Sequence, residues 1–292
     1  MLGAIIGDIC GSVYEWNNEK NVNKIELFKK GCFPTDDSVM TIAVARALMD
    51  TQGLSEKYVK NALVDSMHYF GHMFRHAGYG GHFRAWLRTC DRRPYNSYGN
   101  GSAMRVAAAG WLFENMRDVL EAARMSAEVT HNHPEGIKGA QAIAACVFLA
   151  RTGSTKQQIR EFVEEHFYNL GFTLDQIRPG YEFDVTCQGS CPQAIEAFLE
   201  SENFEHSIKL AISIGGDSDT IAAMTGAIAE AYYGIPETLI NKLYRVLCDT
   251  VDSRGIRHNN SALRRECDAF IQLCRGKLLH SSPMGEGNGM LS

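Results

Sequence analysis

The sequence is poor in the features that mark several common classes of protein. Only seven of its 292 residues are proline, and strand-like alternation of apolar and polar residues is scarce, so long β-structure is not indicated. No uninterrupted apolar stretch approaches the ~18 residues that a membrane-spanning helix needs. The formal net charge of -5 gives no broad positive field, so sequence-independent binding to nucleic acid or to an anionic membrane is not expected.

The cysteines also exclude a class of protein. There are nine, an odd number, and they are scattered without a CxxC pair, so thiols in a reducing compartment fit better than a disulfide framework. The apolar segment from Leu2 to Tyr14 has no basic residue before it and contains Asp8, which argues against a secretory signal. We therefore expect a cytoplasmic protein with no membrane partner; a monomer is favoured, although the oligomeric state stays open.

Apolar residues recur at helical spacing along most of the chain. From Asp36 to Asp50 they stand three and four positions apart, as on a helix that buries one face. No linker, fixed repeat or change of composition divides the chain, so we predict an all-α, single-domain helical bundle over residues 1–280 and a disordered tail over 281–292. Similar stripes are Ala103–Phe113, Val119–Val129, Gly136–Ala150, Gln193–Leu199, Phe204–Ile214, Thr220–Tyr233 and Thr238–Asp252.

Two acidic clusters stand at the heads of such runs, about 180 positions apart: Thr35-Asp36-Asp37-Ser38 and Gly215-Gly216-Asp217-Ser218-Asp219-Thr220. One interpretation is helix capping, because Ser, Thr and Asp are common N-caps. The other is a shared metal site, because oxygen ligands without His or Cys suit Mg²⁺ or Mn²⁺. Carboxylates brought together without a cation would have strongly raised pKa values, which favours a site for two adjacent ions.

The first predicted helix, Leu2–Glu15, adds two more acidic residues. Asp8 and Glu15 are seven positions apart and would share a helix face. Either they belong to the metal site, or Asp8 caps or pairs within the core and Glu15 ends the helix in solvent. Three glycines spaced by four would let another helix or a ligand lie close: Gly3, Gly7 and Gly11.

A glycine-rich loop precedes another predicted helix. Gly99 and Gly101 allow backbone N–H groups to point inward, and the helix Ser102–Phe113 is expected to follow directly. A diphosphate bound there would face the positive end of the helix. The Gly-Asn-Gly sequence is also typical of a hairpin turn, so the loop alone does not decide.

Together these residues resemble the ADP-ribosylglycohydrolases, which act on ADP-ribosylated dinitrogen reductase, arginine and serine. The matching stretches lie in the family's order and cover most of the chain up to about Pro236. They are Gly7-Asp8 to Gly11-Ser12-Val13-Tyr14-Glu15, Thr35-Asp36-Asp37-Ser38, Tyr98-Gly99-Asn100-Gly101-Ser102-Ala103-Met104-Arg105, Ser126 to Thr130-His131, and Gly215-Gly216-Asp217-Ser218-Asp219-Thr220. The resemblance implies an all-α, orthogonally packed bundle with a binuclear magnesium or manganese site.

The resemblance also implies roles for individual residues. Glu15 matches a mobile glutamate near the metals in the serine-directed branch, and His131 matches the histidine at the phosphate and distal ribose. The matching metal ligands are Thr35, Asp36, Asp37, Asp217, Asp219 and Thr220. The loop that cradles the diphosphate and ribose is matched by Ser97, Tyr98, Gly99, Asn100, Gly101 and Ser102.

The implied activity is hydrolysis of the C1″ glycosidic bond of an ADP-ribosylated protein or small molecule. The ions would fix the ribose hydroxyls, Asp37 or Asp219 would orient the attacking water, and Glu15 would act on the leaving group or close the site. The motifs are closer to the serine-directed than to the arginine-directed branch. The acceptor stays open between serine, arginine, a nucleic-acid end and a free metabolite.

Two other functions are compatible with these residues. One is a non-catalytic relative that only binds ADP-ribose, as in lens crystallin-like members of the family, although all six ligand-type residues are present here. The other is a metal-dependent hydrolase of phosphate esters. Release of intact ADP-ribose indicates an ADP-ribosylglycohydrolase, whereas release of inorganic phosphate indicates a phosphate-ester hydrolase.

Four features carry less weight. His68, His72 and His76 are spaced by four, but three histidines along one helix span more than two turns and rarely converge on one tetrahedral zinc, so we expect solvated or partly buried side chains. Cys187 and Cys191 are expected to pack before a helix that begins near Pro192. Trp86 is expected in the core, and His133 in a turn at a rim.

Overall fold

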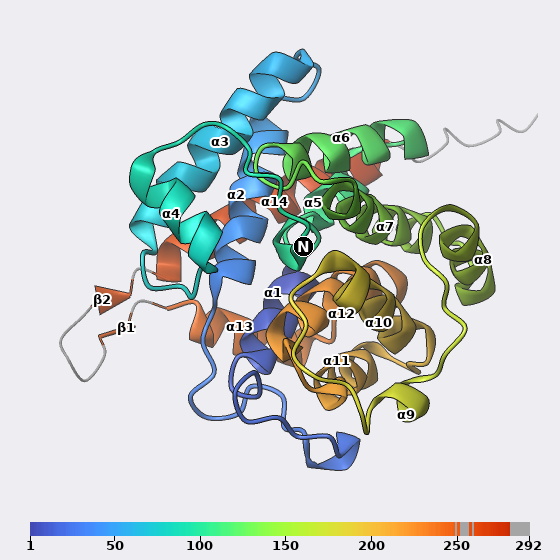
Figure 1. Ribbon diagram of the computed structural model, residues 1–292. Helices are drawn as coiled ribbons and strands as arrows, with labels where there is room; N and C mark the ends of the chain where they lie inside the picture. Colours follow the sequence, from blue (N-terminus) through green and yellow to red (C-terminus); the bar gives the residue numbers. More distant parts are fainter. Residues whose placement is uncertain (249, 252–256, 259, 281–292) are drawn as a thin grey trace, which may run out of the picture.

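The computed structural model describes residues 1–248, 250–251, 257–258 and 260–280, and within these ranges nearly all regular structure is helical (Figure 1). The predicted all-α class is confirmed. The described residues also include two short antiparallel strands of two residues each, β1 (Thr250–Val251) and β2 (Arg257–His258). The predicted tail, 281–292, lies outside the described residues. The α-helices are α1 (Leu2–Gly11), α2 (Asp36–Asp50), α3 (Glu56–Met73), α4 (Gly81–Thr89), α5 (Ala107–Leu112), α6 (Met116–Glu128), α7 (Pro134–Arg151), α8 (Lys156–His166), α9 (Leu174–Ile177), α10 (Cys187–Leu199), α11 (Phe204–Ile214), α12 (Ser218–Tyr233), α13 (Glu237–Val246) and α14 (Asn260–His280), and single 3₁₀ turns are η1 (Val22–Lys24) and η2 (Asn100–Ser102).

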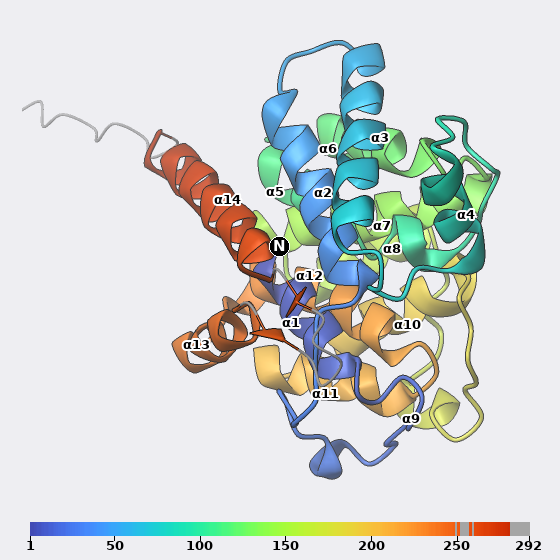
Figure 2. The ribbon, with the colours of Figure 1, turned by 90° about the vertical axis from the view of Figure 1, so that its left-hand side faces the viewer.

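Helix α1 lies in the middle of the bundle, between α2 and the group formed by α10, α11 and α12 (Figures 1 and 2). All ten of its residues are buried, and its most extensive packing is against α12. The predicted glycine groove is the reason: a Cβ at Gly7 would lie 2.0 Å from the Ala222 carbonyl oxygen. The two backbones therefore touch, and this contact brings the N-terminal segment next to the second acidic cluster.

Helix α2 has the bounds that the sequence predicts. Thr35 is its N-cap, with a side chain that accepts a hydrogen bond from the Asp37 N–H, and Asp36 and Asp37 stand in the first turn, where the helix dipole favours negative charge. Its buried face packs against α3, α5 and α1. The start of α2 thus faces the middle of the molecule, where α1 and α12 meet.

Several predicted boundaries are wrong. Helix α1 ends at Gly11, where the Ser12 N–H bonds the Asp8 carbonyl and the start of α12 lies against the backbone; Glu15 is therefore not on the same helix as Asp8. Helix α10 begins at Cys187, capped by Thr186, and contains Pro192. Helix α5 begins at Ala107, after the turn η2, and α13 ends at Val246.

Within the described ranges, no helix combines the length and the apolar character that a bilayer crossing requires.

Candidate active site

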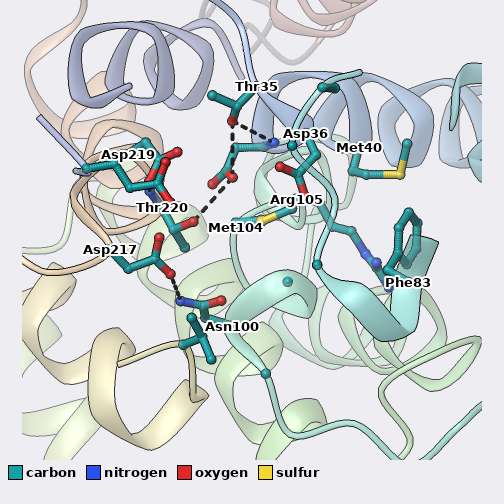
Figure 3. A pocket seen from close by; sticks show the side chains of 18 of the residues that line it. Thr35, Asp36, Met40, Phe83, Asn100, Met104, Arg105, Asp217, Asp219 and Thr220 are labelled. Carbon is teal, nitrogen blue, oxygen red and sulfur yellow. Dashed lines mark hydrogen bonds between the residues drawn. The ribbon is translucent and has the colours of Figure 1, made fainter. Parts of the chain in front are cut away.

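The two acidic clusters meet, because the N-termini of α2 and α12 face each other (Figure 3). The Thr220 hydroxyl donates a hydrogen bond of 3.2 Å to Asp37 Oδ2 and joins the clusters directly. Gly215 and Gly216 both have positive φ, 82° and 66°, so the chain bends sharply into α12 as the glycine pair predicted. Asp217 is the N-cap of α12, but its side chain makes no capping hydrogen bond. Helix capping therefore explains the first cluster only in part and does not explain the second.

Asp8 holds the first cluster in place. Its carboxylate is fully buried and accepts hydrogen bonds from the Thr35 N–H at 2.9 Å, the Thr35 hydroxyl at 2.6 Å, the Ser38 N–H at 3.0 Å and the Ser38 hydroxyl. Burial raises the pKa of Asp8 to about 6, although these hydrogen bonds lower it. Asp8 thus closes the start of α2 from a different helix, as the capping interpretation of this residue expects.

The carboxylates form two groups that share Asp219. Oxygens of Asp8, Asp37 and Asp219 lie within 4.8 Å of one another, and so do oxygens of Glu15, Asp217 and Asp219. Among the described residues, no ion pair links any of these carboxylates to a basic side chain. The Asp37 Oδ1 atom is buried and has no hydrogen-bond partner. An oxygen-only group of this kind could hold a metal ion.

The pKa values reflect this crowding. Burial first, and then the charges of neighbouring carboxylates, raise the pKa of Asp37 and of Asp219 well above the ordinary value. The same causes raise the pKa of Asp36 to about 8, and burial raises that of Asp217. A cation placed among these groups would remove the repulsion and return their pKa values toward the ordinary range.

Glu15 lies at the edge of this cluster. Its side chain is half-buried, and burial together with the charge of Asp217 raises its pKa to about 7. Next to it, Trp16 is 81% exposed and stacks on Phe183, with ring centroids 5.3 Å apart. An ionisable carboxyl group therefore lines the same pocket as an aromatic pair that is open to solvent.

The glycine loop is joined to the cluster by a side chain. Asn100 Nδ2 donates a hydrogen bond of 2.7 Å to Asp217 Oδ2 (Figure 3). Of the loop N–H groups that could point inward, that of Gly99 bonds the Ser97 hydroxyl at 3.1 Å and that of Asn100 bonds the Val185 carbonyl at 2.8 Å. What the glycines supply is room: Cβ atoms at Gly99 and Gly101 would lie 3.6 and 3.2 Å from His131 Nε2.

A hydrogen-bonded chain fixes His131. Arg105 Nη2 donates to the Thr130 hydroxyl at 2.8 Å, and Thr130 Oγ1 lies 2.7 Å from His131 Nδ1. The arginine can only donate, so it occupies one lone pair of the Thr130 oxygen and leaves the hydroxyl proton available to Nδ1; in that arrangement the neutral imidazole carries its proton on Nε2. Burial, with the charge of Arg105, lowers the pKa of His131 well below the ordinary value. His131 therefore stays neutral, with Nε2 beside the glycine loop.

These elements line one pocket of about 670 Å³, a size that suits a small-molecule ligand. Its walls include most of the predicted site residues: Glu15, Thr35, Asp36, Asp37, Ser97, Gly99, Asn100, Gly101, His131, Asp217, Asp219 and Thr220. Two predicted residues are not among them. Tyr98 is 47% exposed and packs on His133, and Ser102 is fully buried behind the pocket, where its hydroxyl bonds the Gly136 carbonyl at 2.7 Å.

Several pocket residues were given no role from the sequence, among them Arg105, Trp16 and Phe183. Arg105 is 1% exposed and its Nε has no hydrogen-bond partner; burial lowers its pKa to about 10. The position of Arg105 in an apolar stretch of the sequence could have indicated a functional residue, because a buried arginine needs polar partners. The exposed pair of Trp16 and Phe183 has no comparable signal, because the two rings come from segments far apart in the sequence.

Other expectations are also settled by the fold. Trp86 is buried, as predicted, and so are Cys187 and Cys191. His133 caps α7 by accepting the Glu135 N–H, at the turn where it was expected.

Comparison with known proteins gives a consistent result. A family model described as ADP-ribosylglycohydrolase matches residues 1–268. The chain is 28% identical to ADP-ribosylhydrolase ARH3 of Mus musculus, with 81% of this chain and 83% of the mouse protein covered. It is 27% identical to ADP-ribosylarginine hydrolase Tri1 of Pseudomonas putida (strain GB-1), with 80% and 70% covered. A solved structure described as an ADP-ribosylglycohydrolase-related protein complex has the same fold, with a TM-score of 0.65 at 24% identity over 94% of this chain and 95% of that one.

Proposed function

Because the chain belongs to the ADP-ribosylglycohydrolase family, and is therefore a glycosidase that acts on ADP-ribose, we propose that it removes ADP-ribosyl groups with the help of two divalent cations, Mg²⁺ or Mn²⁺. The bond cleaved is the C1″ glycosidic bond to the acceptor. The observation that carries the metal dependence is the position of Asp219, which belongs to two adjacent carboxylate groups. A carboxylate shared in this way could bind both ions of a two-ion site.

The residues present fit such ions. Asp37 Oδ1 is an orphaned buried acceptor, and the crowded carboxylates have no basic partner among the described residues. Thr35, Asp36, Asp37, Asp217, Asp219 and Thr220 would hold the two ions. When bound, the ions supply positive charge that fixes sugar hydroxyls, balances the aspartates and makes a water molecule more acidic.

Proton transfer is assigned to the carboxylates. Glu15 stands half-buried beside Asp217 and Asp219, where it could give a proton to the leaving group or take one from the attacking water. Asp37 and Asp219 lie deeper and would orient the attacking water. The transition state has oxocarbenium character, so a negatively charged pocket floor stabilises it.

The diphosphate would lie on the other side of the pocket. There the His131 Nε2–H faces the glycine loop, and the buried Arg105 places a positive charge behind it. A neutral donor backed by a fixed cation suits a phosphate oxygen. We assign Ser97, Gly99, Asn100 and Gly101 to the wall that the diphosphate and ribose contact, with Tyr98 and Ser102 supporting the loop.

The acceptor is the least constrained part of the proposal. The motifs around Glu15 and Tyr98 favour a serine linkage, whereas the similarity to Tri1 supports an arginine linkage. The exposed rings of Trp16 and Phe183 stand where the acceptor would leave, so they are the surface that distinguishes the two. We place the enzyme in the cytoplasm, because buried thiols such as Cys10 and Cys146 suit a reducing compartment.

The test is one assay of the full chain on serine-, arginine- and nucleic-acid-linked ADP-ribose, with Mg²⁺ and with EDTA, using mass spectrometry to identify the product. Intact ADP-ribose is expected from at least one substrate, and only with the metal. Glu15→Gln should lower the rate at least about 100-fold, in the range of general acid–base catalysis, while the exposed Glu165→Gln control should not. Release of inorganic phosphate, or binding without turnover, would contradict the proposal.

A further inference from the structure

Outside the pocket, two histidines and a cysteine converge on the surface between α3 and α4. His68 and His72 are one turn apart on α3, and Cys90 caps the end of α4. One ligand atom from each of the three lies within 4.8 Å of the others, and the Cys90 Sγ is 3.9 Å from His72 Nε2. Both views of the ribbon place α4 against α3 (Figures 1 and 2).

His68 is prepared to act as a ligand. Its Nε2 lies 2.9 Å from the Asp91 carbonyl oxygen, which can only accept, so Nε2 carries the ring proton. The lone pair of the neutral ring is therefore on Nδ1, and this atom is buried without a hydrogen-bond partner. Trp86 stacks on the ring with centroids 4.1 Å apart and fixes its plane. A histidine that donates one N–H to a carbonyl and presents its other nitrogen is the usual form of a metal ligand.

Cys90 is held in an unusual backbone conformation. Its φ of 50° and ψ of 34° are left-handed, a region that non-glycine residues seldom adopt, and its N–H bonds the Leu87 carbonyl at 3.2 Å. This conformation ends α4 and turns the thiol back toward α3. The side chain is exposed, so the thiol proton can leave to solvent when a metal binds.

From this geometry we infer that His68, His72 and Cys90 form a zinc site, with water in the fourth position. In a tetrahedral site, nitrogen–nitrogen and nitrogen–sulfur edges are about 3.4 and 3.6 Å; the separation of Cys90 Sγ and His72 Nε2 is 3.9 Å and the other two are within 4.8 Å, so side-chain rotation of the exposed His72 and Cys90 would close the site. His76 is not part of the site: α3 ends at Met73, and His76 lines the active-site pocket. The third ligand is Cys90, which the four-residue spacing of the histidines in the sequence does not predict.

The site has a mechanical consequence for the pocket. The chain between His72 and Cys90 includes the pocket residues His76, Ala77 and Gly78, and the Ala77 carbonyl accepts the Asp36 N–H at 2.8 Å. A zinc ion would close this segment into a loop and restrain the wall beside the first acidic cluster. This inference does not depend on the proposed function.

Cobalt substitution tests the site in the full chain. Co²⁺ bound by a thiolate gives a sulfur-to-metal charge-transfer band, which an ion in the acidic cluster cannot give because that cluster has only oxygen ligands. We expect wild type to show this band at one equivalent and to lose it on addition of Zn²⁺. Cys90→Ser should abolish it, Cys248→Ser, at another exposed cysteine, should keep it, and His72→Ala should weaken zinc binding at least about tenfold in competition with a chelator.

Thermal unfolding gives a second measurement. Zinc added in saturating Mg²⁺, which occupies the acidic cluster, should raise the Tm of wild type and of Cys248→Ser, and not that of Cys90→Ser. The inference is overturned if wild type shows no thiolate band. It is also overturned if Cys90→Ser, shown to be folded by circular dichroism, keeps the band, because the ion is then held elsewhere.

Discussion

Asn100 and Asp217 are joined by a hydrogen bond of 2.7 Å between the amide nitrogen of one and the carboxylate of the other. Both side chains are buried, and they come from the glycine loop and from the start of α12. The bond lowers the pKa of Asp217 against the effect of burial. It therefore favours the ionised form of Asp217 and fixes the glycine loop relative to the acidic side of the pocket.

Replacing this amide should damage both sides of the pocket. We expect Asn100→Ala to lower kcat/KM about tenfold to 100-fold, because a buried carboxylate loses its donor and the loop loses its anchor. Steady-state assays over a series of Mg²⁺ concentrations measure the effect, and the metal requirement should shift to higher concentration. Asn241→Ala, on the exposed face of α13, is the control; equal loss in both variants would contradict the assignment.

Asp219 should control the binding of both ions, because it belongs to both carboxylate groups. Asp219→Asn is expected to weaken Mn²⁺ binding more than about 100-fold and to abolish turnover. Isothermal titration and elemental analysis measure the stoichiometry. The metal-free variant should also unfold at a higher temperature than the metal-free wild type, because one buried negative charge is removed. Unchanged stoichiometry would refute the role, and Asp50→Asn, on the surface, controls for the loss of charge.

The Thr130 hydroxyl should matter for substrate binding although it does not line the pocket. Thr130→Val keeps the volume but removes one of the two acceptors of Arg105 Nη2, leaving the Ser126 carbonyl, and removes the hydroxyl that lies against His131 Nδ1. We expect KM to rise about tenfold with a smaller change in kcat, in accord with one lost charge-assisted hydrogen bond. Thr89→Val, at an exposed position, is the matched control. A fall in kcat at unchanged KM would argue against a binding role for His131.

The contact between α1 and α12 should tolerate no side chain at its centre. A methyl group at Gly7 would lie 2.0 Å from a backbone oxygen, which cannot move aside as a flexible side chain can. We expect Gly7→Ala to lower the free energy of unfolding by about 3 kcal/mol or more, at the upper end of overpacking effects. Denaturant titration measures it. Gly81→Ala, where an added Cβ meets nothing within 4 Å, should be neutral or slightly stabilising.

The acidic cluster should make the metal-free protein sensitive to alkaline pH. The folded pKa values of Glu15 and Asp36, about 7 and about 8, exceed the ordinary 4.5 and 3.8. The native state therefore holds protons that the unfolded state releases, and stability is lost as pH rises from about 4 through 8.

We expect the Tm in EDTA to fall over this range and Mg²⁺ to restore it at pH 8. Glu15→Gln should make the fall shallower. A Tm that stays flat or rises would show that the carboxylates do not carry these shifts.

The sequence predicted some parts of this fold and site well, for physical reasons. The bounds of α2 and α11 follow from local signals, because Thr35 and Asn203 cap them and apolar spacing continues to their ends. The end of α1 does not follow from local signals, because it is set by the contact of Gly11 with the start of α12. In the same way, the acidic clusters were visible as short motifs, whereas the partners of Arg105 lie at the end of α6, 21 or more positions away in the sequence.

The close contact of α1 with α12 also bears on when the enzyme becomes competent during folding. Gly7 and Ala222 are about 215 positions apart, so this contact closes a very long loop and contributes to slow folding. Before it forms, a nascent or truncated chain carries the first acidic cluster but cannot present Asp217 and Asp219 opposite it. Affinity for divalent cations should therefore arise late, and a metal-binding signal during refolding would report completion of the whole domain.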